Sequence, residues 1–353
     1  MATSMASGGT LKQLSGWRRG STLPGALVDC VLIVPTYRRP KEMVRLLDAL
    51  VGLPGIPGEV LVVDGSPEAG VEQAILAWAE ARSLPFDLVW VKSPAGLTRQ
   101  RNVGLDACSR EFIFFLDDDC LPEPGYFQAI RQVFLADEAG EVGAVRGFLT
   151  NGINLPLTCL WRLRLALGLT PRSEPGRYHA CGTSGSWNMV PRFKGTREVE
   201  VLAGGASAYR REVFLKHRFS EYFYGYAQGE DLEMSRRVAR DWKLLVCGDA
   251  LVNHAHAESG RPAGFPRGRM AVRNRYFIWK RHSPEAGWKD RLRFWGDHAL
   301  IVFYYGVGYV RRPRWTYPLA YAAGTICGAV ECIFSPPRYQ EPPAMREYEF
   351  CFK

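Results

Sequence analysis

The chain has 353 residues, of which 47% are hydrophobic and 23% charged, and its formal charge at pH 7 is +9. This balance is that of an ordinary globular protein with ample material for a core. The positive charge predicts an anionic partner, which could be nucleotide phosphate, an acidic membrane surface or nucleic acid. Nine cysteines stand singly with no C-x-x-C pair, which excludes a zinc ribbon or a disulfide framework and fits a reducing compartment.

The N-terminal stretch is small, polar and basic. Its first 22 residues contain no apolar core of the length that a signal peptide needs. We therefore expect a flexible tail over residues 1–27 and no secretion signal.

Strands and helices are expected to alternate through the next part of the chain. Short buried runs predict strands at residues 31–34, 60–63, 86–91 and 111–116. Helical spacing of apolar residues predicts helices after residue 40, at 68–82 and at 97–108. Alternation with short links is typical of a parallel, doubly wound sheet, in which strand ends share one edge.

Three aspartates, Asp117, Asp118 and Asp119, follow the last of these strands directly. Ligands of open α/β sheets bind beyond the carboxyl ends of the strands. Three carboxylates repel one another there unless a cation neutralises them, and hard oxygen ligands suit Mg²⁺ or Mn²⁺. Pro35 and Asp64, which end two other strands, are expected to line the same crevice. The alternative is a solvated acidic turn, against which the buried strand argues.

Two common nucleotide motifs are absent. No G-x-G-x-x-G follows the first strand and no G-x-x-x-x-G-K-[ST] occurs, so neither an NAD-type site nor a P-loop is indicated. Asp64 could hold a ribose or a base edge, or it could cap the turn Asp-Gly-Ser-Pro. Arg101 and Asn102 lie on a predicted helix beside the crevice, where an arginine could pair with diphosphate or form a solvated helix face.

The second half of the chain contributes separate candidates. Gly204 and Gly205 permit close backbone approach to a ligand, here a sugar. Glu230 and Asp231 open a predicted helix, where the helix dipole stabilises acids whether or not they are functional. His254 follows a predicted strand and could complete a metal shell or be an ordinary packing residue.

Six segments resemble motifs of the family 2 glycosyltransferases, in the order and at the spacing of that family. They are VLIVPTYRR at 31–39, VVDGS at 62–66, RNVG at 101–104, FLDDD at 115–119, GGASAYRR at 204–211 and GED at 229–231. The resemblance covers about residues 30–256. It implies a GT-A fold, which is α/β with a Rossmann-like, mostly parallel central sheet flanked by helices. It also implies transfer of a sugar from a nucleotide diphosphate with inversion at the anomeric carbon.

The same resemblance implies roles for individual residues. Asp231 would be the catalytic base, with Glu230 beside it, and inverting transfer needs such a base for the acceptor hydroxyl. The ligands of Mn²⁺ or Mg²⁺ would be Asp119, Asp117 and His254. The nucleotide would contact Pro35, Thr36, Tyr37, Arg39, Asp64, Arg101, Asn102, Asp117 and Asp118. The sugar or the acceptor would contact Gly204, Gly205 and Trp187.

The implied donor is a UDP-, GDP- or dTDP-linked sugar, and the implied acceptor is a hydroxyl of a glycan or of a lipid-linked glycan. The segment VRNRYF at residues 272–277 resembles bacterial members that build cell-surface polysaccharides, rhamnosyltransferase-like ones among them. No basic-aromatic RNA motif is present, so we expect no nucleic-acid partner.

We expect a catalytic domain over residues 28–258, followed by a C-terminal helical, membrane-associated region over 259–353. The nucleotide-binding half of the domain would be 28–150 and the acceptor half 151–258. Residues 155–169 are apolar with two arginines, which predicts an amphipathic helix on a membrane surface or a core-packed helix.

Two uncharged runs, 299–310 and 315–330, are separated by basic residues. Each falls short of the roughly 20 apolar residues that span a bilayer. A basic, aromatic-rich hairpin that dips into the cytoplasmic leaflet explains them better than a span does. The alternative is a buried core, or a face that holds a second copy in a homodimer.

The expected protein is thus a metal-dependent inverting glycosyltransferase, peripheral on the inner face of the plasma membrane. A sugar nucleotidyltransferase also uses carboxylates and a cation on an α/β sheet, but it does not need the separate Glu-Asp base. A non-enzymatic, basic membrane- or RNA-binding protein is a third interpretation.

Overall fold

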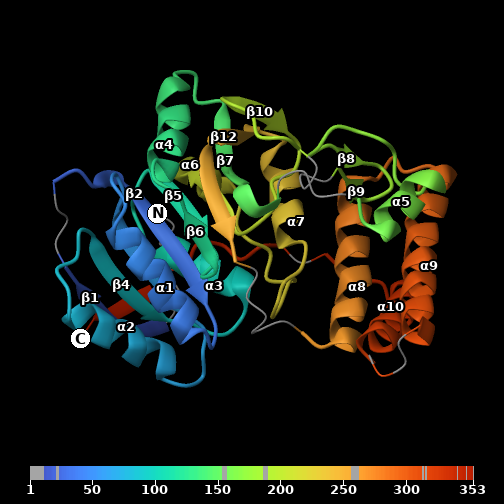
Figure 1. Ribbon diagram of the computed structural model, residues 1–353, viewed down its shortest axis with the longest axis horizontal. Helices are drawn as coiled ribbons and strands as arrows, with labels where there is room; N and C mark the ends of the chain where they lie inside the picture. The colour runs from blue at the N-terminus through green and yellow to red at the C-terminus, as the bar shows by residue number, and fades with distance from the viewer. Residues whose placement is uncertain are drawn as a thin grey trace, which may run out of the picture.

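The computed structural model describes residues 12–20, 24–152, 157–185, 190–255, 262–311, 314, 316–339, 341–346 and 348–352. A central sheet has helices on both faces, and three long helices stand beside it (Figure 1). The strand order is β10 (Thr196–Val199), β12 (Lys243–His254), β7 (Val142–Leu149), β11 (Ala206–Arg210), β5 (Phe112–Leu116), β2 (Leu27–Thr36), β3 (Pro57–Asp64), β4 (Asp87–Lys92), β1 (Lys12–Arg19) and β13 (Tyr348–Phe352). The short strand β6 (Cys120–Pro122) pairs with β12, and β8 (Tyr178–His179) forms a separate ladder with β9 (Thr183–Ser184).

The first half of the sheet is parallel, as the alternation of strands and helices predicts. Strands β4, β3, β2 and β5 are all parallel neighbours. Every residue of β3 and β5 is buried, which is typical of parallel strands covered on both faces. The carboxyl ends of β2, β3 and β5 therefore lie at one edge.

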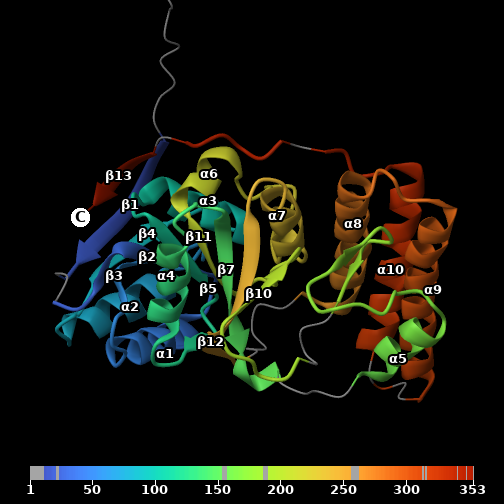
Figure 2. The ribbon, with the colours of Figure 1, turned by 90° about the horizontal axis from the view of Figure 1, so that it is seen from above.

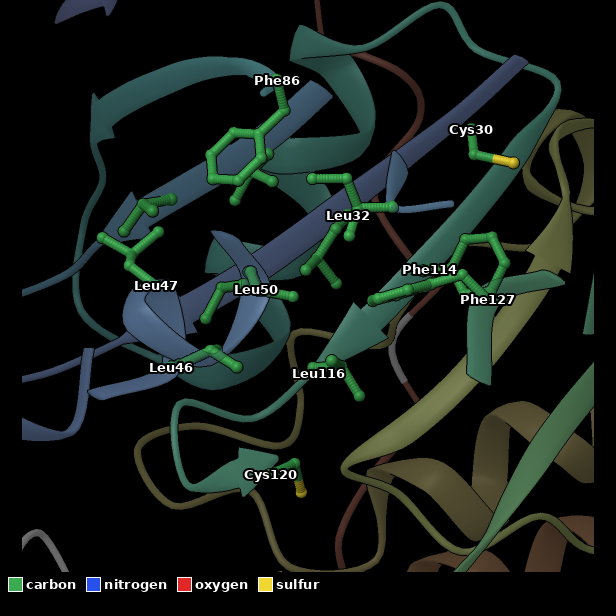
Figure 3. Close-up of a cluster of buried hydrophobic side chains, with 14 of the residues drawn as sticks. Cys30, Leu32, Leu46, Leu47, Leu50, Phe86, Phe114, Leu116, Cys120 and Phe127 are labelled. Atoms are coloured by element: carbon green, nitrogen blue, oxygen red, sulfur yellow. The ribbon is translucent and has the colours of Figure 1, made fainter. Parts of the chain in front are cut away.

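Two hydrophobic layers sandwich the sheet. One face carries α1 (Pro40–Val51), α2 (Gly70–Glu80) and α4 (Tyr126–Ala136), and the other carries α3 (Leu97–Ala107), α6 (Arg211–Lys216) and α7 (Glu230–Val238). Because successive strand residues point to opposite faces, Leu32 packs in the first layer and Ile33 in the second. Figure 3 shows Leu46, Leu47 and Leu50 of α1 beside Leu32 in the first layer.

The second half of the sheet is mixed. Strand β11 is antiparallel to both β5 and β7, whereas β12 is parallel to β7. The antiparallel register places Ala206 opposite Leu116. The Gly204–Gly205 turn that precedes β11 is thereby brought against Asp117, the residue that follows β5.

The two ends of the chain correct the expected boundaries. Residues 12–19, which we expected in a flexible tail, form β1, and this expectation is wrong for them. Trp17 is buried and stacks on Trp90 of β4 with 6.3 Å between ring centroids. β13 pairs with β1, so the C-terminal region is not purely helical. Figure 2 shows both strands at the end of the sheet opposite the three long helices. Pairing with β1 covers the edge of β4 that would otherwise be open.

The three long helices are α8 (Gly264–His282), α9 (Trp288–Arg311) and α10 (Tyr317–Phe334). Helices α8 and α10 approach closely because glycines of each face the backbone of the other. A Cβ atom on Gly268 would lie 2.1 Å from the carbonyl oxygen of Tyr321, and one on Gly324 would lie 2.1 Å from that of Phe265. Any larger residue at these glycines would force the two helices apart.

The expected apolar hairpin corresponds to the end of α9 and to α10. Pro318 falls in the first turn of α10, and Glu331 near its end accepts hydrogen bonds from Arg269 and Arg273 of α8, so neither residue interrupts the helix. Within the described ranges, α10 is the one helix long and apolar enough to cross a membrane by length and composition alone, and a third of it is buried in the protein.

The helix expected at residues 155–169 is shorter than predicted. The described part is α5 (Cys159–Ala166), capped by Thr158, and none of its residues is buried. Its Arg164 pairs with the buried Asp297 of α9. The segment is therefore not packed in the core, and α5 lies half-buried against α9.

Candidate active site

A cavity of about 960 Å³ lies at the carboxyl ends of β2 and β5, between the sheet and the long helices. Most of the residues predicted for the site line it: Pro35, Thr36, Tyr37, Arg39, Asp117, Asp118, Asp119, Gly204, Gly205, Glu230, Asp231 and His254. Trp161 of α5 and Arg267 of α8 close the other side. Three further candidates, Asp64, Arg101 and Asn102, are buried outside the lining. Trp187 lies outside the described residues.

Asp118 is an anchor between two loops of the site. Its carboxylate accepts hydrogen bonds from Thr36 Oγ1 at 2.8 Å and from Arg39 Nη1 at 2.7 Å. Its side chain is only 4% exposed, and this burial raises its pKa to about 7, against the opposing effect of Arg39. Asp118 therefore fixes the loop after β2, while the more exposed Asp117 and the neighbouring Asp119 face the cavity.

Asp119 and His254 come together because β6 pairs with the end of β12. His254 lies opposite Cys120 in that register, and its Nε2 is 3.1 Å from Asp119 Oδ1. The hydrogen bond that His254 donates to Asp119 raises the pKa of His254 above its usual value. A carboxylate oxygen and an imidazole nitrogen are suitable ligands for a divalent cation, with the remaining positions filled by phosphate oxygens and water.

Cys120 is a neighbour of this pair that sequence reasoning missed. Its sulfur and the ligand atoms of Asp119 and His254 all lie within 4.8 Å of one another. Figure 3 shows Cys120 just beyond the end of the strand that carries Leu116, at the border of the hydrophobic layer. Burial raises the pKa of the Cys120 thiol, so the carboxylate and the imidazole are the better cation ligands.

Glu230 and Asp231 are adjacent in sequence but have different surroundings. Glu230 is buried and accepts a hydrogen bond from Arg101 Nη1 at 2.7 Å. Burial, followed by repulsion from Asp231, raises the pKa of Glu230 to about 8. Asp231 lines the cavity, and the backbone N–H groups of Gly204 and Leu232 hold its two oxygens. Asp231 is thus the oriented, accessible carboxylate of the two.

Arg101 and Asn102 lie behind the cavity wall. Arg101 bridges two of the acids, with its Nη2 at 3.3 Å from Asp117 and its Nη1 bonded to Glu230. Asn102 donates to the carbonyl of Phe219 at 2.9 Å and accepts from the N–H of Phe219 at 3.1 Å. Contact of these residues with a nucleotide stays a prediction, since both side chains are used within the protein here.

Asp64 caps the turn that follows β3 with one carboxylate oxygen, and its other oxygen has no hydrogen-bond donor in the described part of the chain. It is fully buried, and its Oδ1 accepts a hydrogen bond from the N–H of Ser66 at 2.8 Å, which caps the turn. Its Oδ2 has no hydrogen-bond partner among the described residues, and the nearest cation is Lys92 Nζ at 3.9 Å. A buried acceptor oxygen without a donor is available for a ligand. Asp64 lies beside Thr36 in the β2–β3 register, which places it at the edge of the cavity.

Gly205 lies so close to Asp117 that a side chain at this position would meet the aspartate. Its φ is +90°, and a Cβ there would lie 3.0 Å from Asp117 Oδ2. Its carbonyl also accepts the N–H of Asp117 at 3.0 Å. Only glycine meets both the backbone conformation and the close approach.

Among the lining residues that the sequence analysis does not select as candidates, Gln100 and Arg146 are polar and buried. Gln100 of α3 donates to the carbonyls of Thr36 and Val63 at 2.7 and 2.8 Å, which ties the ends of β2 and β3 together. Arg146 of β7 is buried and lines the cavity. Arg146 had no signal in the sequence, because a single arginine in an apolar strand does not reveal which face it occupies.

Comparisons with known proteins agree with this arrangement. The sequence profile of glycosyl transferase family 2 matches residues 31–218, a little over half of the chain. Pre-mycofactocin glycosyltransferase of Mycobacterium tuberculosis is 25% identical over 306 residues, and the match covers 84% of this chain and 51% of that protein. The chain therefore spans about half the length of this curated relative.

Two solved structures share the fold. GalNAc-T7 with UDP, GalNAc and Mn²⁺ superposes with a TM-score of 0.51 at 13% identity, over 70% of this chain and 47% of that one. The mannosyltransferase PcManGT of Pyrobaculum calidifontis, in complex with GDP-Man and Mn²⁺, superposes with a TM-score of 0.50 at 17% identity, over 87% of each chain. At such identities the likeness shows the fold alone, and it confirms the expected GT-A architecture. With the match over residues 31–218, it follows that this chain belongs to glycosyl transferase family 2.

Proposed function

We propose that the chain is a metal-dependent inverting glycosyltransferase, which moves a sugar from a nucleotide diphosphate to a hydroxyl of a glycan or glycolipid. The observation that carries the proposal is the composition of one cavity, which holds the Asp119–His254 pair and, separately, the oriented carboxylate of Asp231. Family membership supports it, as do the Mn²⁺, UDP and GDP-Man that accompany the two solved structures.

On the donor side, the loop after β2 and the end of β3 would hold the nucleotide. Asp64 offers a buried oxygen for a base or ribose donor, and the Thr36–Asp118–Arg39 bonds hold the loop in place. Asp119 and His254 would bind Mn²⁺ or Mg²⁺, whose charge stabilises that of the departing diphosphate.

On the acceptor side, Asp231 would take the proton of the attacking hydroxyl. The N–H groups of Gly204 and Leu232 orient its carboxylate toward the cavity. A base in hydrogen-bond reach is typically worth on the order of 10²–10⁴ in rate. Attack from the side of Asp231, opposite the leaving phosphate, gives inversion.

Calorimetric titration with UDP, GDP and dTDP tests this proposal, with Mn²⁺ present and after chelation. We expect one nucleotide to bind in a metal-dependent manner, and Asp119→Ala to weaken its affinity at least about tenfold, because a charge-paired ligand is lost. Asp241→Ala is the matched control, since Asp241 pairs with Lys216 and His217 on the surface, outside the cavity. Absence of binding by all three nucleotides would overturn the proposal.

We extend the proposal to the place of action, peripheral on the inner face of the plasma membrane in cell-surface polysaccharide synthesis. Exposed apolar residues recur along α10 at Ile326, Val330 and Ile333, which is the spacing of one helix face. Phe334 beside them is 82% exposed. An exposed apolar helix face on a protein that also exposes basic residues, such as Arg311 at the end of α9, is typical of proteins that rest on anionic lipid.

Sedimentation with phosphatidylglycerol vesicles tests this location. We expect the wild type to sediment with the vesicles and the double variant Ile333→Ser, Phe334→Ser to stay in solution. Leu215→Ser is the control, because Leu215 of α6 is 73% exposed away from the long helices. A double variant that still sediments would contradict the proposal, and a wild-type dimer that the double variant dissociates would assign the face to a homodimer.

A further inference from the structure

Arg146 is a charged residue at the centre of the sheet. It lies on β7 between Ser207 of β11 and Val246 of β12. Only 3% of the residue is exposed, yet it lines the cavity. Ala144 and Phe148, which share its face of the strand, pack in the layer that includes α7. Its side chain therefore lies on the same side of the sheet as the start of α7, where Asp231 is.

Arg146 differs from the other buried arginines of the described chain in having no acidic partner. Arg101, Arg218 and Arg237 each contact a carboxylate at 2.5–2.8 Å. Arg146 forms no ion pair among the described residues, and its Nε has no hydrogen-bond partner. Burial lowers the pKa of Arg146, but a guanidinium stays charged in proteins. A buried charge without a partner lowers the stability of the fold. An anionic ligand that binds to it would supply the missing partner.

The electrostatic neighbours of Arg146 locate its charge within the site. It interacts electrostatically with Tyr126, Asp231 and Cys120, and also with His254. The guanidinium therefore lies near both the candidate cation ligands and the candidate base. In a sugar transfer, the leaving diphosphate and the incoming acceptor meet in this region. The other lining arginines are engaged within the protein, Arg39 with Asp118 and Arg267 with the hydroxyl of Tyr317.

We propose that Arg146 binds an oxyanion of a reactant, beside Asp231 in the cavity. The inference rests on the proposed function and deepens it. The oxyanion belongs either to the diphosphate of the donor or to a phosphate or carboxylate group of the acceptor. A guanidinium presents paired N–H donors to either group in the same way.

Two variants and two titrations test the inference on the full chain. Arg146→Gln removes the charge, and Arg146→Lys keeps it without the paired donors. The first titration measures the affinity for the nucleoside diphosphate that binds the wild type with Mn²⁺. The second adds inorganic phosphate to protein saturated with that nucleotide and Mn²⁺, to probe an anion subsite for the acceptor. Arg197→Gln is the control, because Arg197 lies exposed on β10, which β12 separates from β7.

We expect one of the two affinities to fall at least about tenfold in Arg146→Gln and to be partly retained in Arg146→Lys, as for other charge-assisted contacts. A loss in the first titration assigns the oxyanion to the donor, and a loss confined to the second assigns it to the acceptor. Both affinities unchanged would overturn the inference and leave Arg146 as a countercharge for the acids.

The experiment distinguishes a failure of the inference about Arg146 from a failure of the proposed function. If the wild type binds no nucleotide, the proposed function fails, and phosphate binding to the nucleotide-free protein then decides for or against Arg146. If Arg146→Gln does not fold, as judged by its melting curve, Arg146→Lys carries the test. A wild-type affinity for both probes in Arg146→Lys would then overturn the inference.

Discussion

Arg101 of α3 donates a hydrogen bond to Glu230 of α7 at 2.7 Å, and its other terminal nitrogen reaches Asp117 at 3.3 Å. One buried guanidinium therefore joins the acid that follows β5 to the acid beside Asp231. The two groups of acids, which come from distant parts of the chain, are held at a fixed distance by this bridge. The positive charge of Arg101 offsets the repulsion between the acids, which explains how several carboxylates can border one cavity.

Replacing Arg101 should destabilise the protein. We expect Arg101→Gln to cost about 3–5 kcal/mol of unfolding free energy, because removal of the guanidinium leaves the buried Glu230 without its partner. Arg99→Gln is the matched control on the same helix. Its pair with Glu221, at 3.4 Å, is half exposed, so the loss should stay below about 1 kcal/mol. Urea unfolding followed by tryptophan fluorescence measures both, and equal losses would contradict the bridge.

Replacing Asp231 should separate chemistry from binding. We expect Asp231→Asn to lower the rate of sugar transfer on the order of 10²–10⁴-fold, because the general base is lost. Nucleotide affinity should stay within about twofold, since the amide oxygen can still accept the N–H of Gly204. Single-turnover kinetics and calorimetry measure the two quantities.

Asp249→Asn provides the control for Asp231→Asn. Asp249 also accepts a backbone N–H, from Gly195 at 2.7 Å, but lies outside the cavity. Its variant should transfer sugar at the wild-type rate. Loss of nucleotide binding in Asp231→Asn, with the fold intact, would show that Asp231 belongs to the donor site.

The parallel half of the sheet could be predicted from the sequence, because it depends on local patterns. Strands β2, β3 and β5 are short apolar runs that end in turn residues or acids, and the helices between them have regular apolar spacing. The strands β1 and β13 at the end of the sheet could not be predicted in this way. Both are partly polar, and they form because β1 pairs with β4 and with β13, which local sequence does not encode.

The candidate site also contains residues that local sequence predicts and residues that depend on how distant strands pair. Asp117–Asp119 and Asp231 follow from motifs, and the structure brings them to one cavity. The burial of Arg146 depends on which strands flank β7, and the contact of Cys120 with His254 depends on the β6–β12 pairing. The nucleotide contact expected of Arg101 stays a prediction, and its pairing with acids could not be predicted, because a motif identifies a residue but not its partner.

Replacing Gly205 should disturb Asp117. We expect Gly205→Ala to cost about 1–3 kcal/mol of unfolding free energy from its backbone conformation. The new methyl would also meet Asp117 Oδ2 at 3.0 Å and displace it, so nucleotide affinity should fall as well. Gly140→Ala is the control, since Gly140 also has a positive φ, +67°, with nothing within 4 Å of its Cβ position. It should lose stability and keep nucleotide affinity, and the same pattern in Gly205→Ala would contradict the contact with Asp117.

A buried cluster behind the active site should make the protein acid-sensitive. Glu233 of α7 is fully buried and accepts two hydrogen bonds from Arg237, at 2.8 and 2.9 Å, while Arg281 of α8 lies at 3.5 Å. Burial alone would raise the pKa of Glu233. The neighbouring His282 and the hydrogen bonds from Arg237 outweigh burial and lower the pKa to about 2.

The sign of the effect follows from the lowered pKa. Between the unfolded value of 4.5 and the folded value of about 2, the unfolded chain binds more protons at Glu233 than the folded chain does. The contribution to stability is therefore complete above pH 4.5 and is lost as the pH falls toward 2. It amounts to about 3 kcal/mol, because each tenfold difference in proton affinity is worth about 1.4 kcal/mol.

The measurement is the difference in unfolding free energy between wild type and Glu233→Gln, from urea unfolding at several values between pH 3 and pH 7. We expect this difference to shrink as the pH falls, because the wild type loses a charge interaction that the variant never has. Glu141→Gln is the control. Glu141 pairs with Lys243 on the surface, so the difference should stay below about 1 kcal/mol throughout. A difference for Glu233→Gln that is constant with pH would show that the cluster does not hold an ionised carboxylate. It would also remove the argument that charge pairing at Glu233 fastens α7, which carries Asp231, to α8.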